Sequence, residues 1–513
     1  MNLTSNVKPA LANVNVTNAS VTFSGTGRIV GTNGLTKAGI GILNLANTNI
    51  YDGVTSIENG TVQVLNGFAL GSSVGETVVA SSGVLSIGDG VTVSGETVRI
   101  SGPGFGGTRG TLRGVGNTNN VWAGPIVLAI SNGRVGTEDG GKLTVSGPIS
   151  DGGNNYSVLY RPGNGGTVIA AGSGHTYGGA TATFGGTVQL GSTTGFSTNA
   201  LQVGTGTVDI NGFSPTVGGL FEFTGSSQGA ILNNGGSASM LTFNVAATNI
   251  FDGTASIQDG SAPISVVKSG GGRQSLISSN SSTYTGSTLV NGGELRLRTT
   301  LVNSPVNVNS GGTLSAGIAA TVNGTITVNS GGTLAMGAPF VISVLTNTST
   351  VTLNAGSSCV FHLDAGNTNL NDRLVANDVN YGGTLLVTNV AFTPVTNGQV
   401  FQLVNATTTA GTFANAASVA IYPGGTGTFS AATGQLTITS VPAAPTLNVV
   451  QSGNSLQFAW SNLNGVYHMQ AQTNSLNVGI STNWFNITSG VTNSATVTIN
   501  PANGSVFYRL VAP

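Results

Sequence analysis

A spacing that recurs four times along the chain constrains its fold most strongly. In each copy, an aromatic residue is followed by one glycine two residues later and by a second glycine nine residues later. The copies contain Tyr51, Gly53 and Gly60; Tyr177, Gly179 and Gly186; Phe251, Gly253 and Gly260; and Tyr284, Gly286 and Gly293. Such a repeat indicates a stacked architecture, in which one unit buries its apolar row only against its neighbours.

In three copies, a segment of alternating polar and apolar residues follows the second glycine. These segments are residues 61–64, 187–190 and 294–297. A period of two predicts a half-buried strand rather than a helix. A shorter unit, VNSGGTL, occurs at residues 308–314 and again at 328–334. We therefore predict a β-solenoid in which glycines provide positive-φ corners, aliphatic side chains fill the interior and Thr, Asn and Ser face water.

Composition excludes several classes of partner. Only 6% of the residues are charged, whereas about 25% is ordinary for soluble domains. The formal net charge is -1, and the basic residues form no stripe, so we expect neither nucleic acid nor an anionic membrane surface as a partner. No apolar run approaches the roughly 18 residues of a transmembrane helix, so we expect no membrane-spanning segment.

The sequence predicts four regions. Residues 1–34 are an N-terminal cap or, alternatively, an extended arm that pairs with another subunit. Residues 35–440 are the solenoid, in which the later coils flatten into a closing sheet. Residues 441–445 are a Pro/Ala linker, and residues 446–513 form a small β-sandwich of short alternating strands. We expect Trp460, Trp484 and Tyr508 to form the core of this sandwich.

The residues that usually carry catalysis are few and dispersed. Glu138 and Asp139 are adjacent, and Asp52 and Asp252 precede repeat glycines as turn residues do. The three histidines, His175, His362 and His468, lack metal-ligand spacing. We therefore expect no catalytic residues and no cofactor. His175, close to a repeat tyrosine, is expected at the surface.

Two further features have alternative interpretations. The segment from Asp364 to Asp372 is rich in oxygen ligands and is a weak candidate for calcium, but it fits no calcium-loop pattern, and an Asx-rich turn is favoured. Cys359, the single cysteine, is predicted to be a small buried hydrophobe rather than half of an intermolecular disulfide.

A basic residue precedes the glycine run in three copies. Lys37, Arg161 and Lys268 occupy this position. The favoured interpretation is a solvated face, and the alternative is a polar contact between coils.

The four copies resemble the autotransporter-associated β-strand repeat, also called the passenger-associated transport repeat. Residues 282–286 (STYTG) and 291–297 (NGGELRL) carry this resemblance best, and residues 49–64 and 175–190 carry it more loosely. The resemblance implies a right-handed parallel β-helix of a secreted bacterial surface protein, many of which are adhesins or structural passengers. The last segment, 446–513, instead resembles a fibronectin-III-like module of large secreted bacterial repeat proteins.

We therefore expect an extracellular, non-enzymatic structural protein at the bacterial surface. The first residues, MNLTSNVKPALANVNV, lack the charged and apolar regions of a signal peptide, so the chain is either cytoplasmic or processed. The charge-poor repeats rich in Asn, Ser, Thr and Gly favour a processed chain. The favoured function is a homopolymer, a head-to-tail filament or sheath joined through residues 1–34 and 446–513. The alternative is a monomeric adhesin or a stalk that binds surface glycans. A third interpretation, a polysaccharide lyase or hydrolase, requires acids clustered on one face.

Overall fold

The computed structural model describes residues 1–511 except 89, 108, 223–227, 339–340, 392, 423, 442–444, 462–466, 476–477 and 489–492. Every regular element in this described part is a β-strand. The chain forms two compact units, Met1–Leu314 with Thr321–Thr325, and Ser315–Ala320 with Ile326–Pro513. Three residues of the predicted linker, 442–444, and the first residue of a predicted strand, Val466, lie outside the described residues.

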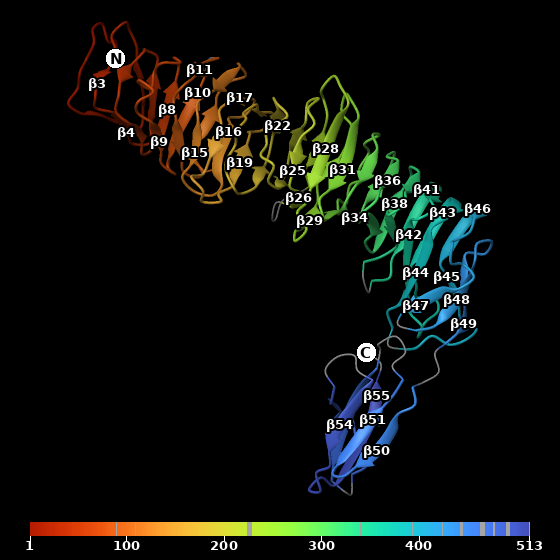
Figure 1. Cartoon of the computed structure of the whole chain (residues 1–513). Helices are drawn as coiled ribbons and strands as arrows, with labels where there is room; N and C mark the ends of the chain where they lie inside the picture. The colour runs from red at the N-terminus through yellow and green to blue at the C-terminus, as the bar shows by residue number, and fades with distance from the viewer. Residues whose placement is uncertain are drawn as a thin grey trace. The chain divides into compact units, whose positions relative to one another are not determined.

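The first unit is a parallel β-solenoid whose successive coils add strands to the same sheets (Figure 1). One sheet contains, in order, β1 (Ala12–Asn15), β4 (Leu35–Ala38), β7 (Thr55–Ile57), β9 (Thr77–Val79), β12 (Val98–Ile100), β15 (Ile126–Leu128) and β18 (Ile149–Ser150). A second contains β2 (Ser20–Phe23), β5 (Ile42–Leu45), β8 (Gly60–Val64), β10 (Gly83–Ile87), β13 (Leu112–Gly114), β16 (Gly133–Thr137), β19 (Val158–Arg161), β21 (Thr181–Thr183), β23 (Leu201–Val203) and β26 (Leu220–Glu222). A third contains β11 (Thr92–Val93), β14 (Asn120–Trp122), β17 (Lys142–Val145), β20 (Thr167–Ala170), β22 (Thr187–Leu190), β24 (Thr207–Asp209), β27 (Ala230–Leu232) and β30 (Ser256–Ile257).

The other strands of this unit continue the same parallel pattern. They are β3 (Val30–Gly31) with β6 (Ile50–Tyr51); the ladder of β25 (Thr216–Val217), β28 (Ser239–Asn244), β31 (Ile264–Ser269), β33 (Thr288–Val290) and β36 (Val306–Val308); the ladder of β29 (Ile250–Gly253), β32 (Arg273–Leu276) and β34 (Gly293–Leu297); and β35 (Thr300–Leu301). Strands β37 (Gly312–Ala316) and β38 (Ala319–Val322) contribute residues to both units.

The register of the second sheet explains the alternating sequence pattern. Leu43, Val62, Leu85, Leu112 and Val135 are successive partners across β5, β8, β10, β13 and β16. All five side chains are fully buried. Each strand therefore places its apolar row on that of the preceding coil, and the free energy of burial comes from the stack rather than from one coil. The predicted all-β class and β-solenoid are confirmed.

The N-terminal residues form a coil of this stack. Strands β1, β2 and β3 pair in parallel with β4, β5 and β6, respectively. Pairing of this segment with another subunit stays a prediction.

In the second unit, two parallel ladders precede a C-terminal sandwich. One ladder contains β39 (Ile326–Val328), β41 (Val344–Leu353), β43 (Arg373–Tyr381) and β46 (Val404–Gly411). The other contains β40 (Thr333–Ala335), β42 (Ser358–Leu363), β44 (Thr384–Asn389) and β47 (Val419–Tyr422), followed by the antiparallel strands β48 (Thr426–Ser430), β49 (Gln435–Ser440) and β45 (Val400–Gln402).

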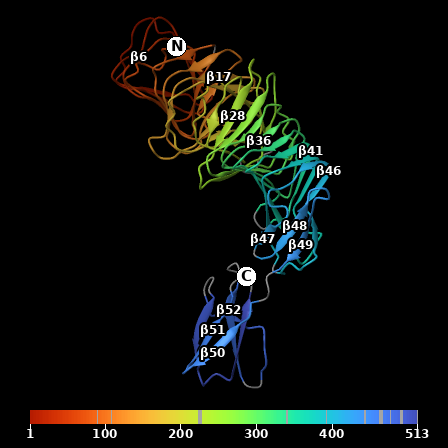
Figure 2. The same cartoon turned by 45° about the vertical axis from the view of Figure 1, so that its right-hand side comes forward.

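The sandwich consists of two antiparallel sheets of three strands each (Figure 2). They contain β50 (Asn448–Ser452), β51 (Ser455–Ala459) and β54 (Ser494–Thr498), and β53 (Phe485–Asn486), β52 (His468–Asn474) and β55 (Ser505–Val511). Phe458, Trp460 and Met469 form the buried cluster, and Tyr508 packs against it. Trp484 lies outside this cluster, contrary to the prediction, because its half-exposed ring stacks 4.2 Å from the guanidinium carbon of Arg509.

Candidate functional site

The repeat tyrosines form a buried hydrogen-bonded pair with a threonine four residues later. The hydroxyl-to-hydroxyl distances are 2.6 Å for Tyr51 and Thr55, 2.5 Å for Tyr177 and Thr181, and 2.6 Å for Tyr284 and Thr288. Burial raises the pKa of Tyr284 to about 12, so its hydroxyl stays protonated at neutral pH. The threonine was missed in the sequence analysis, although the spacing Tyr-x-x-x-Thr is visible in all three copies.

The fourth copy lacks both hydroxyls. Phe251 stands in place of the tyrosine, and Ala255, four residues later, stands in place of the threonine. The Phe251 ring is half-buried and packs against Phe221, with ring centroids 5.7 Å apart. The loss of one hydroxyl therefore coincides with the loss of its partner.

The two repeat glycines are required for different reasons. A Cβ on the first glycine would collide with the neighbouring coil, at 2.2 Å for Gly53, 2.5 Å for Gly179, 2.7 Å for Gly253 and 2.2 Å for Gly286. The second glycine has a positive φ in three copies, at 69° for Gly60, 39° for Gly186 and 60° for Gly293, whereas Gly260 is a close-contact glycine that faces Asn233 O. The predicted positive φ thus explains the glycine at the second position in three copies. At the first position, close packing between coils is what requires a glycine.

Lys37 and Lys268 are completely buried, so the predicted solvated face is wrong for both. The Nζ of Lys268 donates to the carbonyl oxygens of Ser269, Gly270 and Gly292, at 2.8, 2.9 and 2.9 Å. Lys37 repeats this arrangement with carbonyls one and two residues later and one on the next coil. Each ammonium therefore joins two coils, which is the alternative of a polar contact between coils.

Burial also affects the charge of these lysines. It lowers the pKa of Lys268 to about 8, and Glu294 opposes this shift. Burial likewise lowers the pKa of Lys37. The third basic residue, Arg161, is half-buried and lies 4.5 Å above the centre of the Phe184 ring.

The acids singled out from the sequence take part in surface contacts. Glu138 pairs with Arg113 at 2.8 Å, and Asp139 pairs with Arg109 at 2.7 Å. Asp52 accepts a hydrogen bond from a serine hydroxyl, and Asp252 is exposed on β29 rather than at the predicted turn.

The histidines lie in separate environments. His175 is half-buried rather than exposed as predicted, because its Nδ1 accepts the backbone N–H of Ile149 at 3.1 Å. Burial lowers its pKa. His362 is buried, and His468 is half-buried on β52 of the sandwich. Within the described ranges, no three His, Cys, Asp or Glu residues form a group that could hold a metal ion.

The segment considered for calcium is occupied by protein contacts. Asp372 is fully buried, and its Oδ2 lies 2.8 Å from His362 Nδ1 while Oδ1 accepts the backbone N–H of Ser343 at 2.7 Å. Asp364 accepts the N–H of Gly366 within a turn. Cys359 is buried, and desolvation raises the pKa of its thiol.

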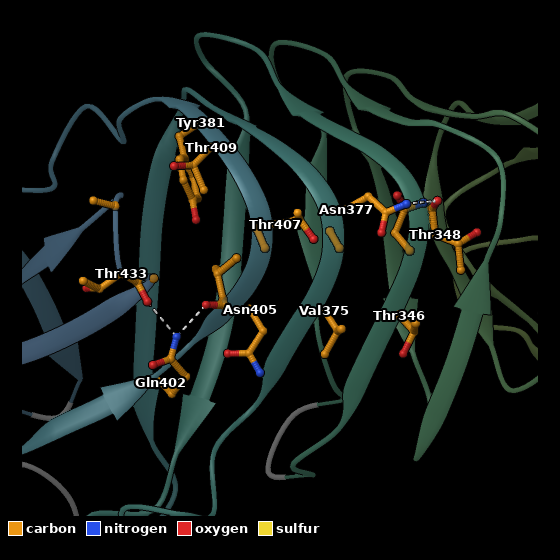
Figure 3. Close-up of a pocket in the computed structure, with 16 residues that line it drawn as sticks. Thr346, Thr348, Val375, Asn377, Tyr381, Gln402, Asn405, Thr407, Thr409 and Thr433 are labelled. Carbon is orange, nitrogen blue, oxygen red and sulfur yellow. Dashed lines mark hydrogen bonds between the residues drawn. The ribbon is translucent and has the colours of Figure 1, made fainter.

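The most promising binding surface is a groove of about 490 Å³ in the second unit (Figure 3). Its wall consists of the long parallel strands β41, β43 and β46, together with residues 432–434. Thr346, Val375 and Asn405 are register partners and form one row across the three strands. Figure 3 shows Thr348, Asn377 and Thr407 in a second row above them. The described residues that line the groove include no acidic or basic side chain.

A β-bulge shapes this surface. The register of β41 and β43 shifts between Asn347 and Thr350, opposite Asn377. The side-chain amide of Asn377 donates to the backbone carbonyl of Thr348 at 2.5 Å, which satisfies an acceptor where the ladder is irregular. Bulges often redirect side chains near binding sites. The bulge was not foreseen, because it lies within five consecutive polar residues, 346–350, where no alternation indicates a change of register.

Tyr381 lies at one end of the groove. It is 6% exposed, and its ring packs against Phe413 and Phe429 with centroid distances of 5.1 and 5.4 Å. Its hydroxyl is buried without a hydrogen-bond partner in the protein. Burial raises the pKa of this hydroxyl, so the group is a neutral donor.

Comparison with known proteins matches two segments to a repeat family. The passenger-associated-transport-repeat model matches residues 35–64 and 266–297. The first segment contains Lys37 and the repeat tyrosine Tyr51, and the second contains Lys268 and Tyr284. Both lysines are those that join two coils. The described part of the chain contains no helix long and apolar enough to cross a bilayer.

One curated relative is the adhesin BmaC autotransporter of Brucella suis biovar 1 (strain 1330). The two sequences are 39% identical over 97 residues, which is 18% of this chain and 3% of the relative. The chain thus spans a small part of this relative's length. The chain is thus similar to the passenger-associated transport repeat over residues 35–64 and 266–297, and to this autotransporter adhesin over 97 residues.

Proposed function

We propose that this chain is a non-enzymatic protein displayed at the bacterial surface, where its β-solenoid serves as an adhesin. The observation that carries the proposal is a coincidence of family match and geometry. Each of the two segments that match the passenger repeat contains a buried lysine that joins two neighbouring coils and a buried Tyr–Thr pair within one coil. The 39% identity to an adhesin supports the same function.

The surface chemistry also favours an adhesive role. The exposed positions are mainly Asn, Ser and Thr, and the formal net charge is -1, so little long-range repulsion opposes contact with another surface. We further propose that the protein works without a cofactor and that residues 446–513 are a fibronectin-III-like module.

Adhesion by intact cells tests this function. A strain that produces the full chain is compared with a deletion strain, using antibody labelling before and after lysis and counts of cells attached to a glycan-coated or host-cell layer. We expect labelling of intact cells and a several-fold loss of attachment in the deletion strain. Labelling only after lysis, or equal attachment of both strains, would contradict the proposal.

A second candidate is a head-to-tail filament, favoured by the strands at the ends of the ladders. In the described structure, β46 pairs only with β43, and β1 pairs only with β4. An unpaired strand edge without charge or proline is a template for another chain, and residues 404–411 (VNATTTAG) contain neither. Electron microscopy at several concentrations tests this. Filaments that disappear on deletion of residues 1–34 support the candidate, and single particles at every concentration reject it.

A further inference from the structure

We infer that the groove over β41, β43 and β46 binds an uncharged oligosaccharide. This inference rests on the adhesin function proposed above and names the class of ligand and the residues that contact it. The volume, about 490 Å³, falls within the range of about 300–1,000 Å³ that is usual for ligand pockets.

The lining matches the chemistry of a neutral sugar. Apart from Val375, the side chains of the two rows are hydroxyls and amides, from Thr346, Thr348, Asn377, Asn405 and Thr407. Each amide both donates and accepts hydrogen bonds, as each sugar hydroxyl does. A charged ligand is disfavoured because the lining offers no opposite charge to offset its desolvation.

The groove is also held in place before any ligand arrives. Its wall consists of three strands in a parallel ladder, in which residues 344–347 and 350–352 of β41 have register partners on β43. The bulge is pinned by the hydrogen bond from Asn377 to Thr348 O. At the edge, the Gln402 side chain donates to the carbonyls of Val404 and Thr433 at 2.6 and 2.8 Å. A preformed site loses little conformational entropy on binding.

Tyr381 supports the groove from beneath rather than contacting a ligand. Its ring is fixed by Phe413 and Phe429, and its hydroxyl is shielded from solvent without a partner in the protein. We therefore do not count this hydroxyl among the groups that bind the sugar.

A second copy of the chain is a less suitable occupant. An added strand would pair with the backbone edge of β46, whereas the groove extends over the faces of β43 and β41, one and two strands further in. Side chains such as Val375 and Thr346 are therefore outside the reach of edge pairing. A saccharide lying across the strands contacts all three.

A glycan array with the purified full-length chain tests the inference. The array carries neutral, sialylated and sulfated oligosaccharides, and affinities for the best neutral glycan are then measured by calorimetry. Val375→Trp fills the groove without removing a polar group, and Asn405→Asp adds a charge to its lining. We expect each to weaken binding at least tenfold. Asn13→Ala, an exposed asparagine on β1, is the matched control and should bind like the wild type.

Several outcomes would overturn the inference. Unchanged binding by Val375→Trp, with a wild-type circular dichroism spectrum and melting curve, would place the ligand elsewhere. Binding of charged glycans alone would reject the ligand class. Loss of self-association rather than glycan binding in the variants, measured by light scattering, would identify a second copy as the occupant. Attachment of intact cells without any glycan binding would reject the groove and leave the adhesin function standing.

Discussion

Two coils of the first unit solve the same packing problem in different ways. In the coil that begins with Tyr284, the tyrosine hydroxyl contacts Thr288, Thr288 contacts Ser304 at 2.8 Å, and Ser304 donates to the carbonyl of Gly286 at 2.7 Å. In the coil of Phe251, the hydroxyls at both corresponding positions are absent. In these two coils, the buried hydroxyls are therefore either present as a hydrogen-bonded set or absent together.

The energetic reason is that an unpaired buried polar group costs far more than a complete pair gains. The coil that follows the Tyr51 coil offers a third solution. Thr77, the register partner of Thr55, donates to the carboxylate of Glu96 at 2.7 Å. Here a carboxyl group takes the role that a tyrosine hydroxyl has elsewhere.

Replacing a buried lysine removes the hydrogen bonds by which it joins two coils. In Lys268→Met, the side chain keeps its approximate volume, but the carbonyls of Gly270 and Gly292 lose their shared donor. We expect the unfolding free energy to fall by roughly 4 kcal/mol, because unsatisfied buried acceptors each cost about 1–3 kcal/mol. Chemical denaturation measures the change. Lys8→Met, at an exposed position, is the control. Equal stability of the two variants would contradict the role of Lys268 in joining two coils.

The coil that contains Glu96 should respond to pH in a way that the tyrosine coils do not. Burial raises the pKa of Glu96 to about 7 from 4.5, with Thr77 opposing the shift. The protonated carboxyl is favoured in the folded state, so its contribution is fully present below pH 4.5 and is lost as the pH rises to 7. The expected loss is about 3 kcal/mol, from a shift of more than two units.

This pH effect is measured as the difference between the wild type and Glu96→Gln in urea unfolding at pH 4.5, 6 and 8. The wild type should lose stability relative to the variant as the pH rises. The exposed Glu222→Gln is the control and should follow the wild type. A constant difference across this range would show that Glu96 does not titrate as described.

A double-mutant cycle isolates the Tyr–Thr pair. Thr288→Val removes the hydroxyl between Tyr284 and Ser304 with little change in shape. We expect a loss of about 2 kcal/mol for this change alone and a smaller additional loss when Tyr284→Phe is combined with it. Unfolding by denaturant measures all three variants. Simple additivity would mean that the hydroxyls are not coupled.

Adding one hydroxyl to the coil of Phe251 is the reverse test and should have the smallest effect. Ala255→Thr places a hydroxyl at a buried position beside Phe251. We expect destabilisation of about 1 kcal/mol because the new group lacks a partner. Phe251→Tyr in the same chain should recover most of that loss in thermal melts, and a further loss in the double variant would show that this coil does not reproduce the Tyr284 geometry.

Residue patterns allowed much of the solenoid to be predicted, but not the roles of its polar residues. Alternation places Val62 and Val64 inside because the strand period of two is local. Whether Lys268 faces water or the interior depends on carbonyls of the next coil, and a lysine before a glycine run is compatible with both. The predicted place of Trp484 in the sandwich core failed for a similar reason, because its partner Arg509 is distant in sequence.

The groove was beyond prediction from the sequence. Its two rows depend on the register of β41, β43 and β46, and one bulge at residues 347–350 sets how those rows align. Sequence marks neither the register nor the bulge, because Thr, Asn and Val suit either face of a charge-poor strand.

The sequence by itself determined that strands stack in parallel coils, because its repeat spacing, its glycines and its period-two segments are local properties of the chain. The tertiary structure alone decided which polar side chains are buried and paired, which coils do without them and where a groove opens. Those outcomes depend on hydrogen-bond partners about twenty or more residues away, such as Lys37 with Asn59 and Asp372 with Ser343. Only the completed stack brings such partners together.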